Sequence, residues 1–371
     1  MTRLMFVSTV TLPSPLANRQ YVMWMCEAFT RFAQVTLCVN QVQGSLDEVY
    51  AFYNVRSSFE IRPVGPVWRP RSFWLSRRYA RMVRHEAPNL VYTCEVKLLG
   101  FMQAFAPMTN YMYETENLSS ELKRYVRHLN DTRGIVCYNS LLKTTLTELG
   151  VEPKRILVAP SGVRLEGYDK AASPEDLRRE LGLPLDMRIV MYVGHFQSWK
   201  GVETLIHSAR MLNGRIAIYL VGGMEPDASR IGRLVSSNRI QNVHLIPFQP
   251  PGRVPKFLQA ADVLVLPNNS SSEYSANYTS PLKLFQYMAS GRPIVASDLP
   301  SLRQILGPHN AFMVKPDDPE ALALGIAGVL RDETEARLRA ERARQRALTL
   351  TWEDRARRIL EFATIPTKGP R

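Results

Sequence analysis

A chain of 371 residues is longer than one hydrophobic core normally serves, so we expect two domains of ordinary size. Hydrophobic residues make up 45% and charged residues 22% of the sequence, which excludes an extensively disordered or fibrous chain. The net charge of +13 suits nucleic acid, an anionic lipid surface or a phosphorylated small molecule, and the distribution of the charges has to decide among them.

The beginning of the chain predicts a strand, a helix and a second strand. Residues 4–10 form an apolar run, residues 21–32 carry apolar side chains at helical spacing, and residues 35–39 form another apolar run. No stretch reaches the roughly 18 apolar residues that cross a bilayer, and the first apolar run is broken too early for an export signal. We therefore interpret the first residues as a buried strand.

The cysteines also indicate where the protein works. They are scattered without CxxC or Cys/His spacing, at Cys26, Cys38, Cys94 and Cys137. Such a set predicts reduced thiols and favours a cytoplasmic protein.

An arginine-rich stretch follows, from Arg56 to Arg84. Its eight arginines stand against the single acidic residue Glu60, and Trp68, Phe73 and Trp74 lie among them. This mixture suits the surface of an anionic membrane, although the solvated face of a basic protein explains it equally well. The aromatic residues form no stacking platform and no nucleic-acid motif is present, so we expect no nucleic-acid partner.

Strand and helix signals alternate through the rest of the first domain. A helix is predicted over residues 72–85, and strands are predicted at residues 88–93, 109–114 and 134–139. Alternation of this kind predicts a doubly wound parallel sheet.

The segment 151–174 is rich in proline, glycine and charge, which indicates a crossing between domains. We place the first domain at residues 1–165 and the second at residues 166–351. The second repeats the pattern of the first. Its predicted strands cover residues 188–194, 217–223, 242–248, 262–267 and 293–297, with helices at 202–212, 254–261 and 281–290. The chain ends in an amphipathic helix.

Loops after the strands of the second domain are the candidate ligand site, because ligands of open α/β sheets bind at the carboxyl ends of strands. Gly194 ends one strand and Lys200 precedes the next helix, where a lysine can reach a phosphate group. Gly222 and Gly223 end the next strand and make room. A surface lysine and ordinary turn glycines are the alternative interpretation.

A third loop leads into a strongly specified helix. Ser280 suits the N-cap and Pro281 the first helical position, while Gly291 suits the left-handed end. Lys283 and Gln286 fall off the apolar stripe of this helix. We expect them to face either a ligand or solvent.

Several other chemistries find no support in the sequence. The six histidines are dispersed, and no pair of carboxylates ends a strand in a way that would hold Mg²⁺. The G-x-S-x-G elbow, the P-loop and the G-x-G-x-x-G fingerprint are absent, which argues against a hydrolase, an NTPase and an ordinary dehydrogenase. We expect no metal and no cofactor.

The order of three segments resembles the C-terminal domain of glycosyltransferase family 4. They are GHFQSWKGVETL from residue 194, AADVLVLP from residue 260 and SPLKLFQYMASGRPIVASDLP from residue 280. The resemblance extends over residues 134–362, and the first domain matches only in pattern. It implies the GT-B fold, in which two Rossmann-like doubly wound parallel-sheet domains face each other across a cleft, with the final helix, residues 352–371, packing back toward the first domain.

The resemblance also implies roles in binding a nucleotide-sugar donor. Lys200 matches the phosphate lysine, and His195 stands where many relatives carry an arginine. The amides around Thr279 and Ser280 would point at the donor diphosphate. Two glutamates of the family, eight positions apart, are replaced here by Tyr278 and Gln286. The full donor-side set implied is Gly194, His195, Lys200, Gly222, Phe248, Tyr278, Thr279, Ser280, Lys283 and Gln286.

In the first domain the resemblance points to carboxylates near the acceptor. Glu116 takes about the position of a histidine that relatives place near the anomeric carbon, and Glu114 precedes it by two residues. Either could orient an acceptor hydroxyl or accept its proton, and both could equally be capping or solvated groups. Asn18 and Arg19 lie in the loop that frames both donor and acceptor in the family, although a capping asparagine and a surface arginine explain them equally well.

The expected function is that of a cytoplasmic, metal-independent, retaining glycosyltransferase. Its partners would be a nucleotide-sugar donor, which is a co-substrate, and a saccharide or lipid-linked acceptor in polysaccharide biosynthesis, with peripheral membrane contact through residues 56–84. The alternatives are a nucleotide-sugar epimerase of the same fold and a GT-B protein that binds nucleotide or sugar without catalysis.

Overall fold

The computed structural model describes residues 2–65, 71–107, 109–168, 172–212 and 214–365. Its contacts divide the chain into two compact units. Unit 1 comprises Met1–Ser161 together with Trp352–Arg371, and unit 2 comprises Gly162–Thr351. Within the predicted basic stretch, Trp68 and Arg69 lie outside the described residues.

Unit 1 is built on a parallel sheet. In spatial order the strands are β5 (Glu60–Pro63), β3 (Ala33–Val39), β1 (Thr2–Val7), β6 (Leu90–Thr93), β7 (Tyr111–Thr115), β8 (Gly134–Cys137) and β9 (Ile156–Val158). The central strands β6, β7 and β8 are buried along their whole length. A small pair, β2 (Thr11–Leu12) and β4 (Gln41–Val42), is also parallel. Chain order reverses between β1 and β6, which marks the switch point of this sheet.

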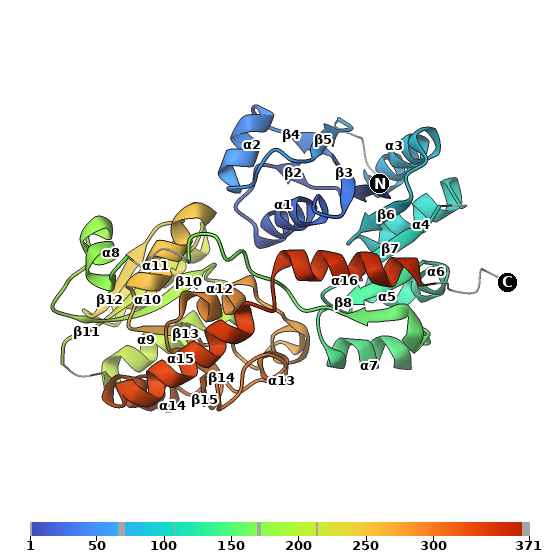
Figure 1. Cartoon of the computed structure of the whole chain (residues 1–371). Helices are drawn as coiled ribbons and strands as arrows, with labels where there is room; N and C mark the ends of the chain where they lie inside the picture. Colours follow the sequence, from blue (N-terminus) through green and yellow to red (C-terminus); the bar gives the residue numbers. More distant parts are fainter. Residues whose placement is uncertain (1, 66–70, 108, 169–171, 213, 366–371) are drawn as a thin grey trace. The chain divides into compact units, whose positions relative to one another are not determined.

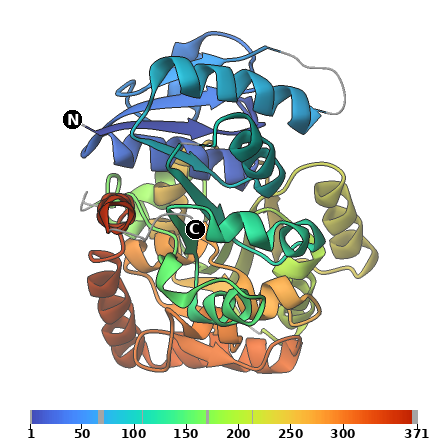
Figure 2. The same ribbon diagram turned by 90° about the vertical axis from the view of Figure 1, so that its right-hand side faces the viewer.

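Helices cover both faces of this sheet, and in Figure 2 its blue strands lie between helices drawn above and below them. They are α1 (Ala17–Phe29), α2 (Leu46–Phe52), α3 (Arg71–Glu86), α4 (Val96–Phe105), α5 (Ser120–Arg124), α6 (Val126–Asn130), α7 (Ser140–Glu148) and, from the end of the chain, α16 (Trp352–Thr364). The ring of Trp352 packs against those of Tyr21 at 5.8 Å and Trp24 at 6.2 Å, so α16 lies on α1 (Figure 1).

Unit 2 repeats the architecture with strand order β12-β11-β10-β13-β14-β15. The strands are β10 (Arg188–Gly194), β11 (Ile216–Gly222), β12 (Val243–Ile246), β13 (Val263–Leu266), β14 (Ile294–Ser297) and β15 (Phe312–Val314). All neighbours pair in parallel. This is the Rossmann order, and its switch point lies between β10 and β13.

The helices of unit 2 bury two apolar layers against this sheet. They are α8 (Pro174–Leu181), α9 (Val202–Ser208), α10 (Asp227–Ser237), α11 (Val254–Ala260), α12 (Leu282–Ser290), α13 (Pro300–Arg303), α14 (Pro319–Arg331) and α15 (Glu333–Ala347). The prediction of two Rossmann-like parallel sheets is confirmed. Strands β5 and β15 were not predicted; both are short strands at the edges of their sheets.

The cysteines agree with the prediction, since Cys26, Cys38, Cys94 and Cys137 are all unpaired. Burial raises the pKa of the Cys38 thiol to about 12, and that of the Cys137 thiol to about 12 as well. Within the described ranges, every helix falls short of the length and apolar character that crossing a bilayer requires.

Candidate functional site

The switch point of unit 2 is flanked by the loops that follow β10 and β13. Gly194 ends β10 and lies in register with Gly222 at the end of β11. A Cβ atom added to Gly222, whose φ is +115°, would lie 2.5 Å from the carbonyl oxygen of Gly194. A side chain at position 222 would therefore clash, so glycine is needed for these two strand ends to approach so closely. Both glycines lie at the edge of the sheet where ligands bind.

The first loop, residues 195–201, connects β10 to α9, and we call it the lysine loop. It carries Lys200 at the end of a short 3-10 turn, Ser198–Lys200. The Lys200 Nζ lies 3.5 Å from the centroid of the Trp199 ring, a cation–π contact. Gly201 follows with φ +70° and is the N-cap of α9. A Cβ atom on Gly201 would lie 1.7 Å from the carbonyl oxygen of Pro267, so this glycine lets the loop after β10 touch the loop after β13.

The loop after β13 holds the lysine loop in place. The Trp199 carbonyl accepts hydrogen bonds from the Asn269 amide at 3.2 Å and the Ser275 hydroxyl at 3.3 Å. Its ring meets that of Tyr274 edge-on at 5.1 Å. Tyr274 begins a π-helical turn, Tyr274–Tyr278, a rare conformation that is frequent at functional sites.

The start of the next helix differs from the prediction. Helix α12 begins at Leu282 with Pro281 as its N-cap and without a capping side chain, so the prediction of Ser280 as N-cap was wrong. The Thr279 amide donates to the Tyr274 carbonyl at 2.8 Å, because the π-helical turn continues to that residue. The amides at the positive end of α12 are therefore those of Leu282 and Lys283. The helix ends at Gly291 with φ +67°, as predicted.

Lys283 was expected to lie off the buried stripe, and that prediction was also wrong. Its side chain is only 7% exposed, and its Nζ has no hydrogen-bond partner among the described residues. The Nζ lies 3.8 Å from the centroid of the Tyr192 ring, and a Cβ on Gly194 would lie 3.8 Å from it. Burial, followed by the charge of Lys200, holds the pKa of Lys283 well below its ordinary value.

Tyr278 and Gln286 occupy the positions of the two family glutamates. Tyr278 is 6% exposed, and its hydroxyl donates to the carboxylate of Glu273 at 2.9 Å. A carboxylate therefore lies beside the tyrosine, although Glu273 itself belongs to the exposed loop before the π-helical turn. Gln286 is half-buried on α12.

His195 and Phe248 complete the predicted donor side. The His195 carbonyl accepts the Tyr192 hydroxyl at 2.6 Å, which fixes the start of the lysine loop. Phe248 follows β12 by two residues and is half-buried.

Asn268 is a buried polar residue that the sequence analysis did not select. It lies two residues after the end of β13, and its side-chain nitrogen and oxygen have no hydrogen-bond partner among the described residues. The sequence could have indicated Asn268, because a polar residue that closely follows a buried strand lies at the edge of the sheet where ligands bind.

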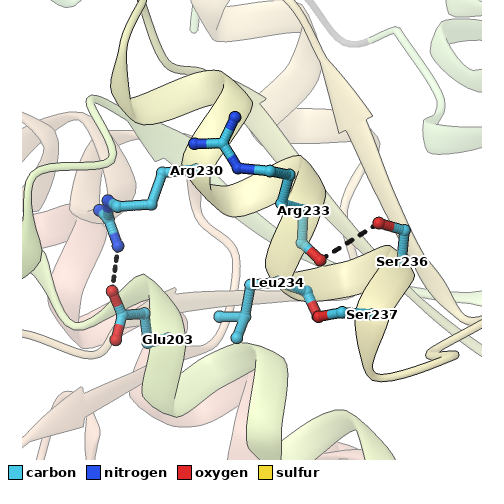
Figure 3. A pocket seen from close by; sticks show the side chains of 6 residues that line it. All are labelled: Glu203, Arg230, Arg233, Leu234, Ser236 and Ser237. Carbon is cyan, nitrogen blue, oxygen red and sulfur yellow. Dashed lines mark hydrogen bonds and ion pairs between the residues drawn. The ribbon is translucent and has the colours of Figure 1, made fainter.

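A shallow pocket of about 630 Å³ lies beside the lysine loop, between α9 and α10 (Figure 3). Arg230 points across it to form an ion pair with Glu203 and donates to the Phe196 carbonyl at 2.7 Å. Since Phe196 belongs to the lysine loop, Arg230 links that loop to α9 and α10.

In unit 1, Glu114 is buried rather than open to a substrate. It is 1% exposed, and its carboxylate forms an ion pair with Arg355 of α16, 2% exposed, at 3.1 Å. It also accepts the hydroxyls of Tyr21, at 2.5 Å, and Tyr92. Burial alone would lower the pKa of Arg355, but Glu114 and the neighbouring tyrosines, foremost Tyr21, together outweigh burial and raise the pKa. The acid–base role of Glu114 stays a prediction, and these contacts favour a structural role.

The other first-domain candidates lie nearer the surface. Glu116 is exposed directly after β7, and Asn18 is exposed in the first turn of α1, whose N-cap is Leu16. Arg19 is half-buried in the same turn.

A further carboxylate, Glu95, was missed, and it lies at the switch point of unit 1. It accepts the Ser8 hydroxyl at 2.8 Å and both the amide and the hydroxyl of Thr9 at 2.6 Å. The sequence could have indicated Glu95, because it follows the buried strand β6 by two residues.

Comparison with known proteins shows which proteins the chain resembles. Residues 173–346 match the family model for glycosyl transferases group 1. The D-inositol 3-phosphate glycosyltransferase of Corynebacterium urealyticum is 26% identical over 320 residues, which covers 80% of this chain and 72% of that protein. Anabaena HepE in complex with UDP-glucose superposes with a TM-score of 0.80 at 15% identity, covering 97% of this chain and 99% of that one. WaaG, a glycosyltransferase involved in lipopolysaccharide biosynthesis, superposes with a TM-score of 0.73 at 15% identity, covering 98% and 100%.

Two Rossmann-like parallel sheets, together with these similarities, define an enzyme with the GT-B fold that transfers glycosyl groups. The predicted resemblance to glycosyltransferase family 4 is confirmed by the match of residues 173–346 to the group 1 model and by the similar glycosyltransferases.

Proposed function

We propose that the protein transfers a sugar from a nucleotide-sugar donor to an acceptor hydroxyl with retention of configuration, the diphosphate binding at the switch point of unit 2. One observation carries this proposal. Lys283 lies buried in the first turn of α12 with no hydrogen-bond partner for its Nζ among the described residues, and it is near enough to Lys200 for that charge to lower its pKa. A site with this excess of positive charge suits a diphosphate. UDP-glucose is bound in the similar protein HepE, which supports testing UDP-sugars first.

The chemistry follows from where charge develops. As the bond between the anomeric carbon and the diphosphate oxygen breaks, negative charge builds on the leaving nucleoside diphosphate. Lys200 and the amides of Leu282 and Lys283 stabilise that charge in this proposal, without a divalent cation. The retaining stereochemistry is inferred from the family resemblance.

Donor binding can be measured directly by calorimetry with UDP, GDP and ADP. We expect one of them to bind, and Lys200→Ala to weaken its binding about 10- to 100-fold, because a hydrogen bond to a charged group contributes about 1.5–3 kcal/mol. Lys315→Ala is the control, since Lys315 is exposed and pairs with Asp318. Failure of all three nucleotides to bind, or unchanged binding by Lys200→Ala, would contradict the proposal.

Incubation with the donor alone separates transfer from epimerisation. We expect slow hydrolysis and no isomerised nucleotide sugar. An isomerised product without an acceptor would favour the epimerase. Binding of a nucleotide with no turnover against any acceptor pool would favour a non-catalytic protein.

We also propose that the acceptor is lipid-linked and that α3 rests on the inner face of an anionic membrane. Trp74 is 43% exposed, and the Arg77 guanidinium lies 5.7 Å from its ring and 5.9 Å from that of Phe105. Arg78 and Arg81 are exposed on the same helix. An aromatic side chain beside cations is the usual composition of an interfacial helix.

Vesicle flotation tests this surface. We expect the protein to float with vesicles of phosphatidylcholine containing phosphatidylglycerol, and to remain in solution with phosphatidylcholine alone. Replacing Trp74 and Arg81 by serine should remove the difference, whereas the same change at exposed Arg215 of unit 2 should not. Equal flotation of all variants would contradict the assignment.

Glu116 is the proposed group that orients the acceptor hydroxyl. It is exposed at the carboxyl edge of the sheet of unit 1, directly after β7. Glu116→Gln should therefore lower transfer while leaving nucleotide binding unchanged, as measured by calorimetry on the same preparation. Unchanged transfer would reject this role.

A further inference from the structure

Lys283 is unusual in both its position and its surroundings. It occupies the first turn of α12, where the helix end is positive and a second positive charge is unfavourable. Its side chain is buried, and its Nζ has no hydrogen-bond partner among the described residues. A buried lysine without a partner is costly in its charged form. The fold holds it there although α12 is otherwise an ordinary packed helix.

The groups around Lys283 do not supply a negative charge. From β10 the facing group is the Tyr192 ring, whose hydroxyl donates a hydrogen bond to the His195 carbonyl. The following loop contributes Lys200, a second positive charge, together with the titratable His195. On α12 itself, the Tyr287 hydroxyl donates to the Val193 carbonyl at 3.4 Å and accepts the Val193 amide at 2.8 Å.

The carboxylates named here on and beside the helices packed on α12 are paired with groups other than Lys283. Lys256 of α11 forms an ion pair with Glu180, and Glu335 of α15 forms one with Arg339. On the preceding loop, Glu273 accepts the Tyr278 hydroxyl. None of these carboxylates contributes to the lowered pKa of Lys283, for which burial and Lys200 are the causes.

We propose that Lys283 is uncharged in the empty site and takes up a proton when a nucleoside diphosphate binds, so that it becomes the second cation of the diphosphate subsite. This inference rests on the proposed function. The bound diphosphate supplies the negative charge that the protein does not place beside Lys283, and the new ammonium group gains an acceptor for its hydrogen bonds. The proton comes from solvent, and no other bond changes.

The direction of the pH dependence follows from linkage. Because the complex holds more protons than the free protein, affinity falls as pH rises through the range between the pKa of Lys283 in the free protein and its pKa in the complex. One proton corresponds to about a tenfold loss of affinity per pH unit in that range.

Calorimetry can count the proton. Titrations with UDP, GDP and ADP at pH 8.5, in two buffers with different enthalpies of ionisation, give the protons taken up from the difference in apparent binding enthalpy. At this pH an ordinary histidine, with a pKa near ~6.5, is neutral, and a terminal phosphate, with a pKa near ~6, is fully ionised, so neither contributes. We expect uptake of a large part of one proton per nucleotide, about 0.5 to 1.

Two variants test the assignment to Lys283. Lys283→Met should bind more weakly and show no uptake, whereas Lys256→Met, which removes an exposed and paired lysine, should keep the full uptake. Lys283→Met should also unfold at the same or a higher temperature, because it removes a buried unpartnered amine. A nucleotide that binds without proton uptake overturns the inference and leaves the proposed function standing. Binding of no nucleotide overturns the proposed function itself.

Discussion

Replacing Glu114 by glutamine tests whether this carboxylate is structural. The substitution keeps the shape of the side chain and its capacity to accept the Tyr21 hydroxyl, but it leaves Arg355 buried without a counter-charge. Removing one partner of a buried ion pair typically costs about 3–5 kcal/mol. For a unit of this size that corresponds to a fall in Tm of roughly 6 to 20 °C.

The assay has to resolve the two units, because a chain with two cores need not unfold in one step. Calorimetry gives the transitions, and hydrogen exchange of peptides from β7 and α16 assigns one of them to unit 1. Glu361→Gln is the matched control on α16, since its ion pair with Arg357 is exposed to solvent and contributes little to stability. The double variant Glu114→Gln/Arg355→Met should recover part of the loss, because no buried charge remains.

The opposite outcome would refute the structural interpretation. If Glu114→Gln unfolds within about 1 kcal/mol of the wild type yet abolishes transfer, the carboxylate acts in catalysis and the ion pair contributes little. If stability falls while nucleotide binding by unit 2 is unchanged, the pair fastens α16 to β7.

Three further predictions concern single residues. Gly201→Ala should weaken UDP binding more than about tenfold by calorimetry, since its Cβ meets the Pro267 carbonyl, whereas Gly182→Ala, with a similar φ and open space, should not. Tyr278→Phe should slow donor hydrolysis and leave UDP affinity unchanged if its contact with Glu273 serves the sugar; an equal loss of UDP affinity contradicts that role. Finally, Cys38 should resist a thiol reagent at pH 8 until the protein is denatured, because burial raises its pKa to about 12.

The fold was predictable because its signals are local. Apolar runs bounded by glycine and proline mark nearly every central strand, and their alternation with helical spacing determines a doubly wound sheet. The lysine loop was found for the same reason, since Gly194 and Lys200 lie at a strand end and before a helix.

The misses have a common cause in contacts between distant residues. The π-helical turn shifts the start of α12 by one residue, and periodicity alone does not reveal it. The burial of Lys283 depends on Tyr192 and Gly194, about ninety residues earlier in the chain. Likewise, Glu114 meets a partner from α16 that no local pattern connects to it.

Two buried cations in this chain show how a ligand site differs from a structural pair. Arg355 is surrounded by acceptors, namely the Glu114 carboxylate and the Ala159 and Pro160 carbonyls, so its charge is satisfied by the protein alone. Lys283 is as deeply placed but has an aromatic face, a helix N-terminus and another lysine as neighbours. Since burial of a charge is tolerated only with compensation, the first arrangement is complete, whereas the amine of Lys283 needs an anion from outside before it can carry a charge. That difference, rather than the presence of a buried charge, is the reason for which we propose a diphosphate subsite beside Lys283 in unit 2.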